Sequence, residues 1–304
     1  MIRMRLAGAR HVVLAFGLMA TSGRPLAGQV AEDIRREYDR RVYAAEQDSA
    51  SVPDLVGAAE AARYMRKFDE SRLYLRVAAL SADAPSDRNA ILSERLWLAL
   101  ATGGGVEEVQ RIFGEARVER VFTPIEVAGW ASAFPELLVG GGLDGTIIAL
   151  AADAERTEYR CACLPTKAWM YRVRGELERS RAYWDSAVSE PLPDRAWPNP
   201  YDEADRRALR ARNLARAGRA DEARVELDRA MGVDLSAFES VSIRRRRAQT
   251  YAELGEVERA VEDLQYLLSV PSPVTVHTLE SRQAWALIRD HPAFQAMLWL
   301  HKGG

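Results

Sequence analysis

The chain contains 304 residues, of which 48% are hydrophobic, so it can bury a large core. Its 42 basic residues nearly balance its 44 acidic residues, which excludes the domain-wide positive field of a general nucleic-acid-binding protein. Only two cysteines and four histidines occur, and none of them has metal-site spacing, so we expect neither a metal nor another cofactor.

Residues 1–28 have the pattern of a secretory signal peptide. Arg3, Arg5 and Arg10 precede a mostly apolar run over 12–20, and small residues follow as far as Gly28. The apolar run is too short to span a bilayer, which needs roughly 20 apolar residues. We therefore expect cleavage near Gly28 and a mature bacterial protein in the periplasm or secreted, without stable membrane insertion.

The clearest local pattern is a pair of amphipathic helices that meet at Gly255. Apolar residues recur at helical spacing on both sides of this glycine: Ala248, Tyr251 and Leu254 before it, and Ala260, Leu264 and Leu267 after it. A glycine at such a turn permits the left-handed conformation that ends the first helix. The pattern predicts a helical hairpin, which needs neighbours of the same kind to bury its two apolar stripes.

The same arrangement of small and apolar residues recurs along the chain around six turn positions. These positions are separated by 34 to 43 residues: Arg66, Gly104, Gly141, Gly175, Gly218 and Gly255. A period of this length is typical of a helical solenoid. Proline or a capping residue near Pro53, Ser86, Thr123 and Pro165 predicts the starts of first helices.

The two C-terminal copies share the sequence Gly-x-x-x-x-Ala-x-x-x-Leu, beginning at Gly218 and at Gly255. This motif resembles the tetratricopeptide repeat (TPR), whereas the copy at Gly175 matches less well and the first three are degenerate. The resemblance implies an all-α protein, a right-handed superhelical solenoid of about six hairpins over 52–270. An N-terminal helix over 29–51 would precede it, and a capping segment over 274–304 would follow.

The capping segment carries a second resemblance. The stretch from Ala284 to Phe294 is similar to the tail that closes TPR regions after bacterial sensory kinases, although this chain has no kinase segment. We expect a helix over 279–289 and another short helix after Asp290, which would cover the apolar side of the last hairpin.

In TPR proteins the first helices line a concave groove that holds a partner peptide. The groove-facing positions that match in the C-terminal repeats are Trp169, Arg172, Arg212, Arg245 and Gln249. We expect the arginines and Gln249 to hold carboxylates of an acidic or C-terminal peptide, with Trp169 as a flat apolar contact. The asparagines of the family's carboxylate clamp are absent from the matching positions, and the alternative is that the arginines only solvate a helix face.

Two other motifs have structural interpretations. The run from Gly140 to Gly145 formally matches a dinucleotide-binding fingerprint, but a helix is expected before it instead of a strand, so we interpret it as an inter-helix turn. Cys161 and Cys163 are either small core residues or a strained disulfide in an oxidising compartment.

No clustered acid, base and nucleophile is visible, so we predict no catalytic residue. The sequence favours a non-catalytic protein–protein interaction scaffold in the bacterial envelope, which binds a peptide or protein partner in its concave groove. The alternatives are a structural subunit of a larger envelope complex and an enzyme with a pocket in the concave face.

Overall fold

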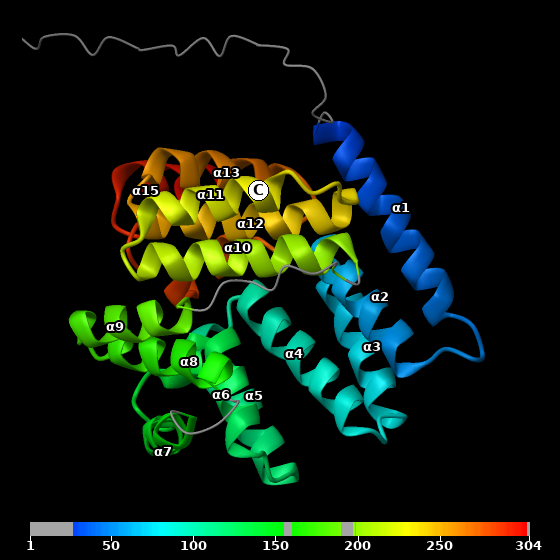
Figure 1. Cartoon of the computed structure of the whole chain (residues 1–304). Helices are drawn as coiled ribbons and strands as arrows, with labels where there is room; N and C mark the ends of the chain where they lie inside the picture. The colour runs from blue at the N-terminus through cyan, green and yellow to red at the C-terminus, as the bar shows by residue number, and fades with distance from the viewer. Residues whose placement is uncertain (1–26, 155–159, 190–196, 198, 303–304) are drawn as a thin grey trace, which may run out of the picture.

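The computed structural model describes residues 27–154, 160–189, 197 and 199–302. These residues form helices, turns and loops with no strand among them, which confirms the predicted all-α class (Figure 1). No helix in this part of the chain is both long and apolar enough to cross a membrane. The expected signal peptide lies almost entirely outside the described residues.

A single helix, α1 (Ala27–Ala45), precedes six helix pairs, so the expected N-terminal helix is present but ends earlier than expected. The helices of each pair pack on one another: α2 (Val52–Tyr64) with α3 (Phe68–Leu80), α4 (Pro85–Ala101) with α5 (Gly105–Glu119), α6 (Pro124–Ala133) with α7 (Asp144–Ala154), α8 (Arg160–Val173) with α9 (Leu177–Ala187), α10 (Pro200–Arg216) with α11 (Ala220–Met231), and α12 (Ala237–Leu254) with α13 (Val257–Ser269). A short 3₁₀ helix, η1 (Pro135–Leu138), follows α6.

Several first helices begin where the sequence indicates. Ser51 and Thr123 cap α2 and α6 through capping boxes, in which the side chain of the capping residue and that of the third helical residue each accept a backbone N–H. The predicted start of a helix near Pro165 is wrong, because this proline lies inside α8, which begins five residues earlier. The side chains of Cys161 and Cys163, in the first turn of α8, lie outside the part that the structure describes.

The predicted turns are left-handed at five of the six positions. Gly255, for example, has φ +74° and ends α12, and even Arg66 has φ +60°. Gly104 is the exception with φ −67°, because its neighbours Gly103 and Gly105 adopt the positive values of +89° and +62°. The Gly140–Gly145 run lies between η1 and α7, as the interpretation as a turn requires.

Small residues let the helices approach closely. Ala223 of the hairpin α10–α11 and Ala260 of the hairpin α12–α13 are completely buried. Leu227 and Leu264, on the same two hairpins, are also buried in the core.

The first hairpin contacts the last one, although they are far apart in sequence. The Tyr64 hydroxyl lies 2.7 Å from the Ser242 hydroxyl, and the Tyr64 ring stacks on Phe238 with centroids 4.3 Å apart. The Arg66 guanidinium donates to the carbonyl of Leu268, and α1 packs on α12 (Figure 1). The stack of hairpins therefore closes on itself.

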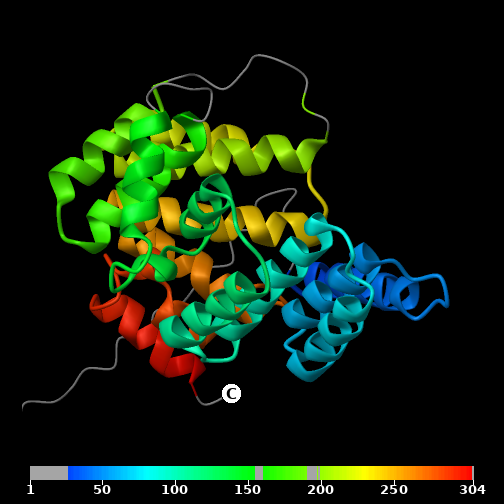
Figure 2. The same cartoon turned by 90° about the horizontal axis from the view of Figure 1, so that it is seen from below.

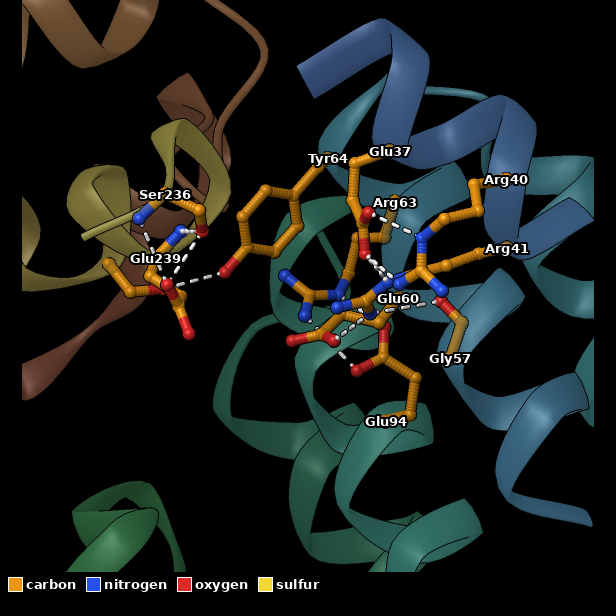
Figure 3. Close-up of polar contacts among 11 residues, drawn as sticks. Glu37, Arg40, Arg41, Gly57, Glu60, Arg63, Tyr64, Glu94, Ser236 and Glu239 are labelled. Carbon is orange, nitrogen blue, oxygen red and sulfur yellow. Dashed lines mark hydrogen bonds and ion pairs between the residues drawn. The ribbon is translucent and has the colours of Figure 1, made fainter. Parts of the chain in front are cut away.

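A polar network joins α1, α2 and α4 beside this contact (Figure 3). Arg41 of α1 donates to Glu37 of its own helix and to Glu60 of α2, each at 2.7 Å. Arg63 of α2 donates twice to the Glu94 carboxylate of α4, at 2.5 and 3.0 Å. Each arginine here meets at least one carboxylate.

The C-terminal tail differs from its prediction. The expected helix over 279–289 is wrong, because α14 (Val276–Ser281) ends at Arg282, which has extended backbone, and only the 3₁₀ turn η2 (Gln283–Trp285) follows. The break lets Arg282 donate to the carbonyl of Ala133 while the backbone N–H of Gln283 donates to the carboxylate of Glu136. Tertiary contacts thus outweigh the local helical pattern.

The last helix, α15 (Pro292–His301), packs on α13 and confirms the expected cap. Its buried residues Phe294, Met297 and Leu298 join the same hydrophobic cluster as Leu264 and Leu267. Figure 2 shows the tail, in red, at the lower left beside the orange helix of the last hairpin. The segment α14 packs on α4 and α5, and Thr275 donates to the carbonyl of Ala101 at the end of α4. The tail therefore joins the last hairpin to the second one.

Candidate functional site

The structure places the five predicted partner-binding residues on α8, α10 and α12. Trp169 is 3% exposed and Gln249 is 2% exposed, whereas Arg172, Arg212 and Arg245 are half-buried. Arg212 donates to the side-chain oxygen of Gln249 at 2.6 Å, and the Arg172 guanidinium lies 5.3 Å from the centre of the Trp169 ring. Four of the five residues thus meet as two pairs, and Arg245 is four residues before Gln249 on α12.

Glu253 binds two arginines in this region and is not among the residues that the sequence predicts for the site. One of its carboxylate oxygens accepts from Arg216 and the other from Arg172, each at 2.8 Å. Although burial acts to raise the pKa of Glu253, the two guanidinium groups hold it below its usual range. Glu253 is therefore a buried anion that ties α12 to both α10 and α8.

The repeat spacing contains the signal that could have identified two of these contacts. Arg212 and Gln249 are 37 residues apart, and so are Arg216 and Glu253. This separation equals the distance between the turns at Gly218 and Gly255, because equivalent positions of successive hairpins stack on one another. The Arg172–Glu253 contact spans 81 residues and follows no repeat.

Arg216 is the most deeply buried of these arginines, with its side chain 1% exposed. Its guanidinium lies 4.3 Å from the centre of the Trp169 ring and 4.8 Å from that of Trp184. Such cation–π contacts compensate part of the cost of removing the cation from water. Burial nevertheless lowers the pKa of Arg216 to about 10.

A second part of the region surrounds Trp97 of α4. The guanidinium groups of Arg245 and Arg282 lie 4.7 and 4.4 Å from the centre of this one ring. Arg282 also lies 3.5 Å from the carboxylate of buried Glu136, whereas Arg245 has no carboxylate partner among the described residues. Burial lowers the pKa of Arg245 to about 10, and the neighbouring Arg246 acts in the same direction.

We call these residues together the inner arginine cluster. Its six members are Arg172, Arg212, Arg216, Arg245, Arg246 and Arg282. Three carboxylates face them: Glu253, Glu136 and Asp205, the last of which lies 2.5 Å from Arg246. Arg216 and Arg245, with pKa values near 10, remain protonated at neutral pH, so these two groups can bind anions but are poorly suited to acid–base chemistry.

A separate cleft of about 800 Å³ lies between α3 and α5, over α4. Its apolar lining includes Leu75, Ile91, Leu98 and Ile112. A smaller cleft of about 320 Å³ shares Ala79, Ile91 and Arg95 with it, and we call the two together the α4 cleft. The charged lining consists of six arginines and three glutamates: Arg72, Arg76, Arg88, Arg95, Arg111, Arg120, Glu107, Glu108 and Glu119.

Comparisons of the chain with protein-family models, with curated proteins and with solved structures returned no match. Within the described residues, no group of three or more histidine, cysteine, aspartate or glutamate side chains is arranged to hold a metal ion.

Proposed function

We propose that this protein is a non-catalytic interaction scaffold that binds an acidic amphipathic segment of a partner protein in the α4 cleft. The scaffold would be the TPR-like right-handed superhelical stack that the sequence motifs resemble. The contacts between residues 37 apart on α10 and α12 support this arrangement, because they repeat the spacing of the motif. The resemblance of residues 1–28 to a signal peptide supports a place in the bacterial envelope.

The α4 cleft carries the proposal, because it combines an apolar floor with room for a chain segment. The floor is formed by side chains from three helices, among them Leu75 of α3, Leu98 of α4 and Ile112 of α5. Apolar anchors on one face of a partner helix, spaced three or four residues apart, fit a floor of this kind.

The charge of the lining indicates the sign of the partner. Several of the arginines already have partners, such as Arg111, which contacts Glu108 and Glu115. Arg76 is exposed and has neither an ion pair nor a hydrogen bond with another described residue. The net positive lining favours a segment with acidic residues beside its apolar anchors, and this complementarity raises the association rate as well as specificity.

The proposal is tested with a designed acidic amphipathic peptide that has leucines on one helical face and glutamates on the other. A matched peptide with lysine in place of glutamate is the control, and fluorescence anisotropy measures both affinities. We expect the acidic peptide to bind at least tenfold more tightly. Ala79→Glu should abolish this preference, because it adds bulk and a repelling charge in the middle of the cleft.

A matched substitution on the surface of α9, Arg181→Glu, should leave the affinity unchanged, since Arg181 lies outside the cleft. Equal binding of the two peptides, or full binding by the Ala79→Glu variant, would remove the proposal. Binding of a partner at Trp169, Arg172, Arg212, Arg245 and Gln249 stays a prediction. In the same assay, a loss in Arg245→Glu without a loss in Ala79→Glu would place the peptide there instead.

A further inference from the structure

The inner arginine cluster contains twice as many arginines as carboxylates, although most of its members are buried or half-buried. Burying an ion without a counter-ion costs several kcal/mol, so proteins normally pair such groups. Glu253 serves two arginines, and Glu136 and Asp205 serve one each. Arg212 and Arg245 remain without a carboxylate in the described part of the chain: Arg212 contacts the neutral amide of Gln249, and Arg245 contacts the Trp97 ring.

These two arginines also have unused donors. The Nε atoms of Arg212 and Arg245 are buried, and no described residue accepts a hydrogen bond from either of them. The same holds for both Nη atoms of Arg216 and for Nη1 of Arg282. A buried donor without an acceptor costs about 1 to 3 kcal/mol, and more when it is charged. One added acceptor within reach of several of these donors would therefore remove more than one such cost.

Arg212 and Arg245 are on the packed helices α10 and α12, and Gln249 connects the two. Arg245 and Gln249 are one helical turn apart on the same face of α12, and Gln249 contacts Arg212. Arg245 in turn shares the Trp97 ring with Arg282. Burial lowers the pKa of Arg212, and the guanidinium groups of Arg216, Arg246 and Arg245 act in the same direction. Arg212 and Arg245 are each partly exposed to solvent.

We infer that the protein binds a multivalent oxyanion between Arg212 and Arg245, with Arg282 beside it. The fork of N–H donors on each guanidinium matches the oxygen atoms of phosphate, sulfate or a small polycarboxylate. One such ion would supply both the missing negative charge and several missing acceptors. None of these three arginines lines the α4 cleft, and the site goes beyond the scaffold function proposed above.

Bound anion would also stabilise the closure of the stack. Arg245 is on α12 of the last hairpin, Arg282 is in the tail, and the Trp97 ring that they share is on α4 near the N-terminus. A ligand that contacts arginines from two of these segments favours the closed arrangement, because it binds the folded chain and not the unfolded one. The anion would therefore act as a stabilising ligand of the whole fold.

The test is isothermal titration calorimetry of the full chain with sodium phosphate, sodium sulfate and sodium succinate as separate probes. The ionic strength is held constant with sodium chloride, because exposed charges respond to any salt. We expect saturable binding of at least one probe with one ion per chain. At a hundredfold excess over Kd, the thermal midpoint should rise by about 4 °C relative to the matched chloride buffer.

Arg212→Gln and Arg245→Gln should each weaken this binding at least tenfold, and Arg245→Lys should weaken it less because the charge is kept. Arg181→Gln on the surface of α9 serves as the matched control and should leave the affinity unchanged. Far-ultraviolet circular dichroism shows whether each variant is folded before it is titrated. The preference of one probe over the others identifies the chemical source of the oxyanion.

Failure to observe saturable heat with any of the three probes would overturn the inference. Binding that persists unchanged in both glutamine variants would overturn it as well, since the ion would then lie elsewhere. The outcome is separable from that of the α4 cleft, because Ala79→Glu should affect peptide binding and leave anion binding intact.

Discussion

The polar network of α1, α2 and α4 balances its buried charge, whereas the inner arginine cluster does not. In the first region, Arg41 is shared between Glu37 and Glu60, and Arg63 meets both oxygens of Glu94 (Figure 3). In the second region, three carboxylates face six arginines. Both regions are dominated by arginine, so residue type does not separate them. The difference lies in the ratio of the charges, which assigns the first a structural role and leaves the second in need of a ligand.

The largest effect is expected in the balanced region. Arg63→Met should lower the free energy of unfolding by about 3 to 5 kcal/mol, because it leaves the buried Glu94 carboxylate without its cation. Urea unfolding at neutral pH measures the change. The double variant Arg63→Met/Glu94→Leu should recover most of the loss, and a double variant as unstable as the single one would show that packing, and not charge, holds α2 to α4.

A comparable loss of roughly 3 kcal/mol is expected for Glu253→Gln, since Arg172 and Arg216 would both lose their carboxylate. This change widens the imbalance of the inner arginine cluster. It should therefore tighten phosphate binding in calorimetry, because the positive excess of the cluster rises by one charge. Weaker phosphate binding in a variant that remains folded would contradict the account.

The pH dependence of the same variant gives a further check. The pKa of Glu253 is lower in the folded protein than in the unfolded chain, so its contribution to stability is fully present above the unfolded value of about 4.3. That contribution is lost as the pH falls through the folded pKa. The difference in unfolding free energy between the natural chain and Glu253→Gln should thus be constant from pH 7 to about 5 and shrink below that. A difference that grows on acidification would have the wrong sign.

Arg245→Met should have a small effect in chloride buffer, within about 1 kcal/mol, because the loss of the contact with Trp97 is offset by the removal of an unpaired buried charge. Addition of phosphate should then stabilise the natural chain and not the variant. Thermal unfolding of both proteins in the two buffers measures this contrast. A loss of several kcal/mol in chloride alone would show that the arginine is fully compensated by the protein.

The smallest effect is expected at the surface. Arg181 and Glu178 form an exposed pair 3.7 Å apart on α9, so Arg181→Gln should change the free energy of unfolding by less than about 0.5 kcal/mol. Denaturant unfolding tests whether this variant is a valid control for the others.

The features that the sequence predicts well are those governed by local chemistry. Glycine tolerates positive φ, so the turns at Gly175, Gly218 and Gly255 are visible in the sequence and occur as left-handed residues. The same principle fails at Gly104, where three consecutive glycines allow the left-handed conformation to fall on either neighbour. The helical pattern of 279–289 fails because Arg282 gains contacts to Ala133 and Glu136 only if the helix stops.

In the candidate site, too, some contacts follow from the sequence pattern and others depend on tertiary packing. Repeat register places Arg212 and Gln249 on facing helices, which is why the predicted groove positions do gather. The contact between the first and last hairpins depends on Tyr64 and Phe238, which belong to no repeat motif, so the repeat register does not predict it. The α4 cleft has no signature in the sequence, because a cleft reflects the space between helices and has no motif of its own.

The most direct measurement is anomalous diffraction from crystals of the full chain grown in chloride and soaked in selenate, a heavier analogue of sulfate and phosphate. The account predicts a selenium peak within hydrogen-bonding distance of Arg212 and Arg245. Selenate confined to surface arginines, with no peak between these two side chains, would contradict it.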